Sequence, residues 1–139
     1  MSAPAPAVRV GDSRELVLVD DLTRTQIVQY AGASGDYNPL HTDEVFASQV
    51  AGYPTVFAHG MLTMGMTGRV LTDWFGVDRL AAYGARFVAQ VWPGDTLTAT
   101  ATVEAVREDG GATLADLTVT TRNQRDEVVL TGTATVRVG

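Results

Sequence analysis

Residues Leu97-Thr98-Ala99-Thr100-Ala101-Thr102-Val103-Glu104-Ala105 alternate apolar and polar side chains without a break. Successive side chains of a β-strand point to opposite faces, so this alternation predicts a strand with one buried and one solvated face. The apolar side chains are mostly alanine. A sheet face made of such small side chains leaves room for one large object packed against it.

The same period of two recurs on both sides of this stretch. Asp109-Gly110-Gly111 favours a hairpin, and Pro93-Gly94-Asp95 favours a turn. A meander of strands is therefore predicted, with these residues facing inward: Tyr83, Ala85, Phe87, Ala89 and Val91 before it, and Ala115, Leu117, Val119, Val128, Leu130, Ala134 and Val136 after it.

The large object is predicted to be a helix over residues 59–75. Its apolar residues, four of them Met or Trp, cover much of the circumference, and charge enters only at Arg69 and Asp73. A helix that is apolar nearly all round is a buried helix. Gly60, Gly65 and Gly68 lower helix propensity, so close packing against another backbone is expected to compensate.

The bulk properties exclude several classes of function. The chain of 139 residues fits one domain, has no cysteine for disulfides or thiolate metal sites, and carries a net charge of −6. All ten cationic residues are Arg, and they are scattered, which argues against nucleic acid. No window is long and apolar enough for a membrane span. Residues 1–9 are expected to be a flexible tail without signal-peptide character, residues 10–139 one domain, and the location cytoplasmic.

One short stretch concentrates the chemistry. Ser34-Gly35-Asp36-Tyr37-Asn38-Pro39-Leu40-His41 combines an acid, an amide and an imidazole with Gly and Pro. Asn-Pro favours turn initiation and Pro39 fixes φ, so a turn is predicted here. Such a turn could aim the Asp36 carboxylate and the His41 imidazole at one point as an acid/base pair.

The remaining elements complete an α+β architecture. Glu15–Val19 is a strand candidate, Thr23 with Gln26 forms a capping box for a helix, and residues 43–49 favour a second short helix. One strand, helices and then a meander is the order of a hot-dog fold, in which a curled antiparallel sheet wraps around a central helix. The open sheet edge predicts at least a dimer.

The motifs resemble those of a known family. Tyr30, the run from Ser34 to His41 and Ala47 are similar to the hydratase-2 motif of MaoC-like (R)-specific enoyl-CoA hydratases. Ala58-His59-Gly60-Met61-Leu62 is similar to the second signature of that family. The run His59-Gly-Met-Leu-Thr-Met-Gly resembles more closely the catalytic B subunits of bacterial hydroxyacyl-ACP dehydratases of long-chain fatty acid elongation.

The resemblance implies that Asp36 and His41 share a catalytic water, which adds across a trans-2-enoyl thioester or is eliminated in reverse, the reaction of a hydro-lyase. It implies that the Gly60 N–H polarises the thioester carbonyl and that no metal or cofactor takes part. Substrate contacts are expected from Tyr37, Asn38, His59 and Met61, and the substrate arm is CoA or acyl carrier protein. Many relatives have a Ser on the central helix where this chain has Gly68, which predicts a wider acyl tunnel there.

Other interpretations remain open at this point. Asp36 and His41 could be a capping turn residue and a core histidine, His59 a structural histidine, and Asn38 a turn support. An acyl-CoA thioesterase would keep the fold and change the chemistry. A third alternative is a subunit that is active only in a heterodimer, or a non-catalytic acyl-binding module, instead of a homodimer or higher homo-oligomer.

Overall fold

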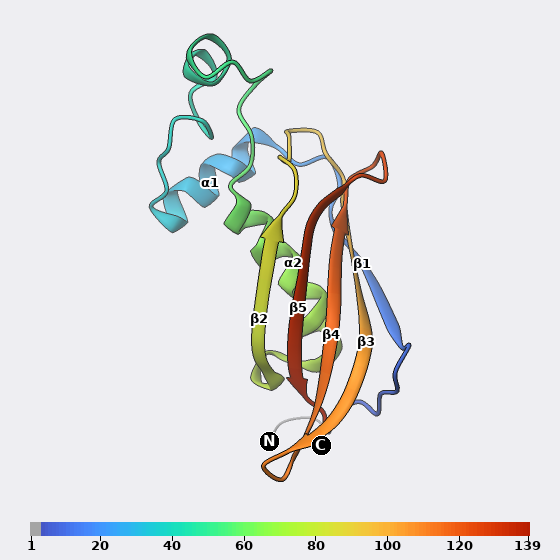
Figure 1. Ribbon diagram of the computed structural model, residues 1–139. Helices are drawn as coiled ribbons and strands as arrows, with labels where there is room; N and C mark the ends of the chain where they lie inside the picture. The colour runs from blue at the N-terminus through green and yellow to red at the C-terminus, as the bar shows by residue number, and fades with distance from the viewer. Residues whose placement is uncertain (1–3) are drawn as a thin grey trace.

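The computed structural model describes residues 4–139, whose strands form one antiparallel sheet in the order β1-β3-β4-β5-β2 (Figure 1). The strands and helices, in chain order, are β1 Ser13–Val19, α1 Arg24–Ser34, η1 Phe46–Val50, α2 Gly60–Phe75, η2 Val77–Arg79, β2 Leu80–Phe87, β3 Leu97–Asp109, β4 Ala112–Arg122 and β5 Val128–Arg137.

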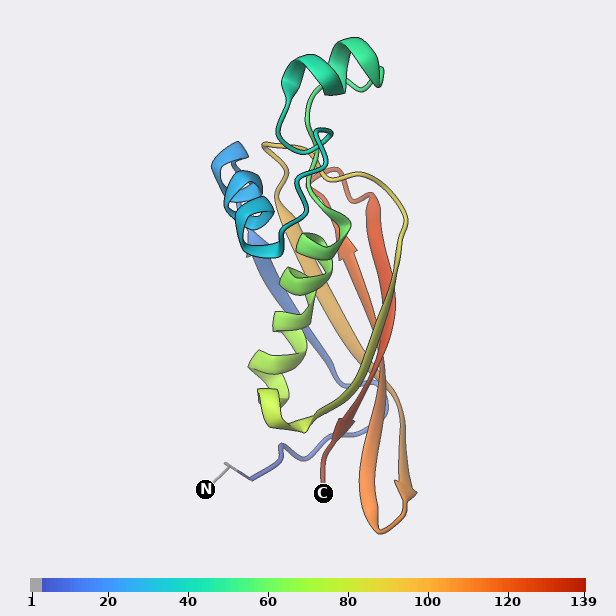
Figure 2. The same ribbon diagram turned by 90° about the vertical axis from the view of Figure 1, so that its left-hand side faces the viewer.

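The sheet curves around α2, as the hot-dog prediction required (Figures 1 and 2). The inner face of the sheet carries the predicted small side chains: Ala99, Ala101 and Ala115 are fully buried. Leu71 and Val70 of α2 are buried in the same cluster. The fold class predicted from the alternating strands and the single apolar helix is therefore confirmed.

The prediction that α2 is buried nearly all round is wrong for this chain. The sheet covers one side of the helix, where Thr63 and Thr67 are buried, while Met61 on another side is 56% exposed. The prediction that the glycines of α2 pack closely against another backbone is also wrong. A Cβ at Gly60 would meet the Phe87 ring, and a Cβ at Gly68 would meet the Tyr83 ring.

Two further details differ from the sequence pattern. The pairing of β3 with β4 shifts register between Val103 and Ala105, and Ala105 is only half-buried. Such an irregularity interrupts the alternation that the sequence suggested. The short helix predicted at residues 43–49 is present over Phe46–Val50 as a single π-helical turn.

The capping box predicted at the start of α1 is present. Thr23 caps the helix, with its hydroxyl accepting from the Gln26 N–H and the Gln26 side chain accepting from the Thr23 N–H. Gly35 ends the helix at φ +75°, a conformation that suits glycine. The segment that follows, α1 and the start of α2 gather at one end of the molecule (Figure 2).

The predicted flexible tail over residues 1–9 lies partly outside the described part of the chain, which begins at residue 4. Residues 4–9 form no helix or strand, and Val8 packs against the core. Among residues 4–139, none of the helices has the length and hydropathy that crossing a membrane requires.

Candidate active site

The stretch predicted to carry chemistry folds as a series of side-chain-stabilised turns. The carboxylate of Asp36 accepts from the Asn38 N–H at 3.2 Å, and the Asn38 side-chain oxygen accepts from the Leu40 N–H at 3.0 Å. The Asn38 carbonyl then accepts from the His41 N–H at 3.0 Å. Asp and Asn are suited to such local bonds with their own backbone. The turns place the exposed Asp36 beside the buried His41.

A backbone carbonyl fixes the tautomer of His41. Its Nδ1 lies 2.7 Å from the carbonyl oxygen of Phe57, which only accepts hydrogen bonds, so Nδ1–H donates. In the neutral ring the lone pair is then on Nε2. The Phe57 ring meets His41 edge-on at a centroid distance of 5.3 Å. The contact with Phe57 therefore defines which ring nitrogen of His41 donates and which can accept.

His59 is the second imidazole of the site and is almost completely buried, with 1% exposure. Its Nε2 donates to the backbone carbonyl of Asp36 at 3.0 Å, and its ring stacks on His41 at a centroid distance of 3.8 Å. Burial lowers its pKa below the usual 6.5, the nearby His41 lowers it further, and the bond to Asp36 offsets part of this. His59 is therefore neutral near pH 7.

Asp36, His41 and His59 each offer one potential ligand atom, and these atoms lie within 4.8 Å of one another. Both histidines use their other nitrogen on a backbone carbonyl, as metal ligands do. Their rings, however, are stacked with an interplanar angle of only 22°. Lone pairs in nearly parallel planes do not converge on one tetrahedral ion, so the arrangement suits proton transfer to a water better than metal binding.

Gly60 lies next to this cluster at the first position of α2. Its N–H belongs to the first turn, where no intrahelical acceptor is available, and His59 provides no side-chain cap. A pocket of about 260 Å³ opens here, lined by Phe57, Gly60, Phe87, Val88, Ala89 and Gln90. A Cβ on residue 60 would lie 2.9 Å from the Phe87 ring, so any larger residue there would have to displace that ring.

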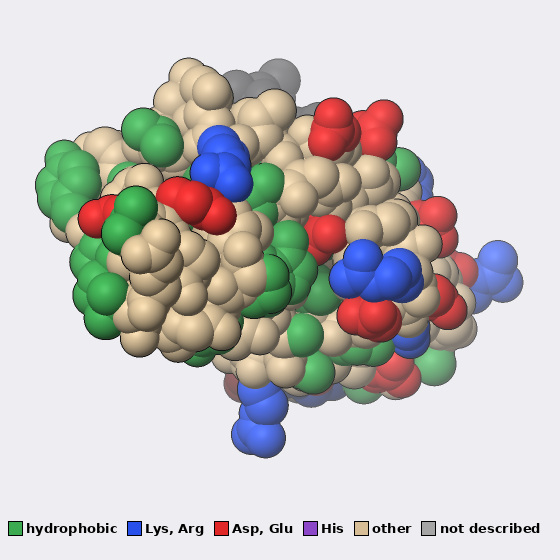
Figure 3. All heavy atoms as spheres, turned by 90° about the horizontal axis from the view of Figure 1, so that it is seen from above, with side chains coloured by type: hydrophobic (Ala, Val, Ile, Leu, Met, Phe, Trp, Pro, Cys, Tyr) green, Lys and Arg blue, Asp and Glu red, His purple; other side chains and the backbone are tan. Residues whose placement is uncertain are grey.

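The other predicted contact residues lie at the surface. Tyr37 is 69% exposed and Met61 56% exposed, whereas Asn38 uses its side chain within the turn. The end of the molecule seen in Figure 3 shows several exposed hydrophobic side chains and no histidine. Large hydrophobic residues of α1 and of the segment that follows it are more than half exposed: Val28, Tyr37, Val45 and Val50.

Sequence reasoning missed a polar cluster that holds this segment. Glu44 accepts from the Thr55 hydroxyl at 2.7 Å and pairs with Arg24 of α1 at 3.0 Å. Arg24 also donates to the Thr55 hydroxyl at 2.8 Å. These three residues are far apart in the sequence and match no short motif, so only the folded chain reveals the cluster. We call it the Glu44 cluster.

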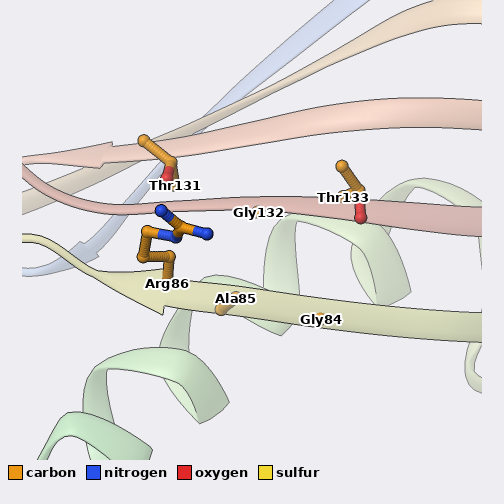
Figure 4. Close-up of a pocket in the computed structure, with 6 residues that line it drawn as sticks. All are labelled: Gly84, Ala85, Arg86, Thr131, Gly132 and Thr133. Carbon is orange, nitrogen blue, oxygen red and sulfur yellow. The ribbon is translucent and has the colours of Figure 1, made fainter.

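A larger hollow lies away from these groups. It measures about 420 Å³ and is lined by Gly84, Ala85, Arg86, Thr131, Gly132 and Thr133, on paired strands β2 and β5 (Figure 4). Arg86, Thr131 and Thr133 are exposed. The residues that line this hollow include no acid/base pair, unlike the cluster at the start of α2.

Comparison with known proteins identifies the family. Residues 6–127 match the family described as MaoC like domain, which is most of the chain. The chain belongs to the MaoC-like family.

Several MaoC-like relatives have described activities. The chain is 35% identical to the (R)-specific enoyl-CoA hydratase of Rhodospirillum rubrum over 137 residues, which are 93% of this chain and 88% of that protein. It is 40% identical to enoyl-CoA hydratase ChsH3 of Mycobacterium tuberculosis over 101 residues, or 70% of this chain. The matched part is only 32% of ChsH3, so this MaoC-like chain corresponds to about a third of that relative.

Solved MaoC-like structures share the fold over nearly the whole chain. The (R)-hydratase from A. caviae involved in PHA biosynthesis superposes with a TM-score of 0.77 at 30% identity, covering 97% of this chain and all of that one. The ChsH1-ChsH2 complex from Mycobacterium tuberculosis gives a TM-score of 0.78 at 26% identity, covering 94% of this chain and 98% of that chain. Members of the family thus occur in complexes of two different subunits.

Proposed function

We propose that this chain hydrates trans-2-enoyl thioesters with (R) specificity and, in reverse, dehydrates (3R)-hydroxyacyl thioesters. The observation that carries the proposal is that the Asp36 carboxylate and the His41 imidazole each place a ligand atom within 4.8 Å of the other, with the Gly60 N–H at the adjacent helix start. The hydratase relatives support the reaction class. The reaction is that of a hydro-lyase.

The residue types fit the proton movements. In hydration, the water oxygen forms a bond to the β-carbon and gives up one proton to a base, while the α-carbon takes up a proton from an acid. Asp36 and His41 lie together and share these two proton transfers through one water. The hydroxyl group and the proton are therefore added to the same face of the double bond. A positioned acid or base of this kind contributes about 10²- to 10⁴-fold to the rate.

The carbonyl end needs a separate group. Negative charge develops on the thioester oxygen as the α-carbon gains carbanion character. The Gly60 N–H is in the first turn of α2, where the helix dipole is positive, so it is the proposed donor to that oxygen. Tyr37 and Met61 are exposed around this position and are proposed to contact the substrate.

The test is a substrate assay on the purified chain. Loss of enoyl absorbance from crotonyl-CoA and from a longer trans-2-enoyl-CoA, followed by chiral analysis of the 3-hydroxyacyl product, should give the (3R) isomer. A thiol-reactive dye in parallel should detect no release of CoA. Rapid thiol release without hydration would contradict the proposal and favour a thioesterase.

A second candidate is a catalytic subunit that needs a different hot-dog partner. Strand β2 is at the sheet edge, and Phe87 and Val88 at its end are about half exposed beside the Gly60 pocket. The structure of the ChsH1-ChsH2 complex provides a precedent for two-subunit assembly. Light scattering of the purified chain distinguishes the cases: an active homodimer supports the first candidate, and an inactive monomer supports the second.

A further inference from the structure

His59 contacts both parts of the proposed acid/base pair. Its Nε2–H donates to the backbone carbonyl of Asp36, and its ring stacks on the ring of His41. Tyr30 of α1 closes the remaining side, edge-on at a centroid distance of 4.8 Å. With 1% exposure, the ring lies behind the site and not in it.

A residue that only filled this space would not need an imidazole. The Nδ1 atom of His59 is buried and, among the described residues, has no hydrogen-bond partner. Burying an unpaired polar atom lowers stability, and an apolar ring would avoid that cost. Relative to an apolar ring the imidazole lowers stability at this position, and what it adds is its bond with Asp36 and its contact with His41.

Both contacts constrain how the pair is arranged. The bond to the Asp36 carbonyl holds the turn that carries the carboxylate. The stacked ring prevents His41 from tilting away from the orientation in which Nδ1–H meets the Phe57 carbonyl. The Asp36 carbonyl also requires the proton of His59 to be on Nε2, so the two imidazoles hold opposite tautomers.

We propose that His59 is a positioning residue, which fixes the Asp36 turn relative to the His41 ring and keeps the Nε2 lone pair of His41 available. The inference rests on the proposed hydratase function for its kinetic part, and on geometry alone for the tautomers. It differs from the substrate contact expected from the sequence, because the ring is turned toward protein groups.

The composition makes a direct test practical, because His41 and His59 are the only histidines. Imidazole ¹⁵N NMR of the wild type, recorded where both rings are neutral, should therefore show one ring protonated at Nδ1, which is His41, and one at Nε2, which is His59. Assignment follows from the single variants. A His59 ring protonated at Nδ1 would overturn the proposal even if the chain showed no enzymatic activity.

Two substitutions separate the two contacts. His59→Phe keeps a ring to stack on His41 and loses the donor to Asp36, whereas His59→Gln keeps a donor at the place of Nε2 and loses the ring. We expect His59→Phe to lower kcat for crotonyl-CoA about 10- to 100-fold with KM changed little, since a small misplacement of reacting groups has effects of this size. His59→Gln should recover part of that loss.

A matched control variant removes buried side-chain packing in α2 without changing a contact of Asp36 or His41. Val70 is 2% exposed on the same helix, so Val70→Ala destabilises the fold but should leave the His41 spectrum and kcat unchanged. In His59→Gln, which lacks the stacked ring, the His41 ring should populate both tautomers, whereas His59→Phe should keep the Nδ1–H tautomer. Wild-type kcat and an unchanged His41 spectrum in both His59 variants would refute the proposal. If His59→Phe does not fold, the same two measurements on His59→Gln provide the test. A silent wild type with the expected spectrum would refute the hydratase function alone.

Discussion

Tyr83 of β2 lies over Gly68 of α2. A Cβ built on Gly68 would be 3.3 Å from the Tyr83 ring, and the Tyr83 hydroxyl donates to the backbone carbonyl of Met64 at 2.7 Å. The wider acyl tunnel expected from glycine at position 68 is therefore wrong at this point, because the phenol ring occupies the space. The same contact has a consequence for stability at alkaline pH.

Burial raises the pKa of Tyr83 from 10.0 to about 12. Below pH 10 the phenol is neutral in both the folded and the unfolded chain. Between pH 10 and about 12 only the unfolded chain ionises, so the stabilisation by Tyr83 is lost as pH rises through this window. At pH 9, Tyr83→Phe should lower the unfolding free energy by about 1 kcal/mol, because the hydrogen bond to the Met64 carbonyl is lost. In urea unfolding, the difference in unfolding free energy between wild type and Tyr83→Phe should be smaller at pH 11 than at pH 9. A larger difference at pH 11 would contradict the raised pKa of Tyr83.

Gly60 and Phe87 form a second close contact, beside the proposed carbonyl-binding N–H. Gly60→Ala adds a methyl that must displace the half-exposed Phe87 ring. We expect stability within about 1 kcal/mol of wild type but a loss of kcat/KM of about tenfold or more, because the pocket at the helix start is reshaped. Steady-state assays on crotonyl-CoA measure this.

The control for that substitution is Gly65→Ala on the same helix. A Cβ at position 65 would meet nothing within 4 Å, so this variant should gain stability and keep its activity. Removing the obstructing ring in Gly60→Ala/Phe87→Ala should restore part of kcat/KM. An equal loss of activity in the Gly65 and Gly60 variants would show that the effect belongs to the helix and not to the Phe87 contact.

A buried hydroxyl pair joins α2 to the sheet. Thr67 and Thr121 are fully buried, and their hydroxyl oxygens are 2.6 Å apart. Thr67→Val or Thr121→Val leaves one hydroxyl unpaired and should cost about 1–3 kcal/mol of unfolding free energy. The double variant should cost clearly less than the sum, which a urea-unfolding double-mutant cycle measures. Strict additivity would mean that the bond contributes nothing.

The Glu44 cluster predicts acid sensitivity of the segment over residues 42–57. The Thr55 hydroxyl lowers the pKa of Glu44 below 4.5, aided by the Val56 N–H and Arg24. Its stabilisation is therefore present above pH 4.5 and lost as pH falls through the lower folded value. Glu44→Gln should speed amide hydrogen exchange in residues 42–57 about two- to fivefold at pH 7.

Glu104→Gln serves as the comparison for Glu44→Gln. Glu104 likewise accepts from a threonine hydroxyl, that of Thr118, but on the exposed part of the sheet. Exchange in residues 42–57 should not change in this variant. If both substitutions speed exchange equally, or neither does, the Glu44 cluster does not hold the segment.

The sequence predicted those features that depend on neighbouring residues. Strand alternation, the Thr23 capping box and the turn from Asp36 to His41 each follow from side chains a few positions apart. The acid/base candidates came from the same turn. For Gly60, the N-terminal position on α2 followed from the start of the apolar run.

What the sequence did not predict depends on distances across the fold. The acceptor for His41 is a backbone carbonyl at Phe57, which no side-chain pattern reveals. Whether Gly68 leaves a gap depends on where the Tyr83 ring packs, and whether α2 is enclosed depends on how far the sheet curves. The bond from His59 to the Asp36 carbonyl likewise depends on how distant parts of the chain pack together, so no local pattern predicts it.

The most direct test of the central claim is enoyl-CoA hydration by Asp36→Asn and His41→Asn. The asparagine at position 41 keeps a donor near the place of Nδ1 for the Phe57 carbonyl and removes the Nε2 base. If Asp36 and His41 move the protons of the catalytic water, each folded variant should lose about two or more orders of magnitude in kcat. Variants that fold normally and hydrate crotonyl-CoA at the wild-type rate would contradict the account.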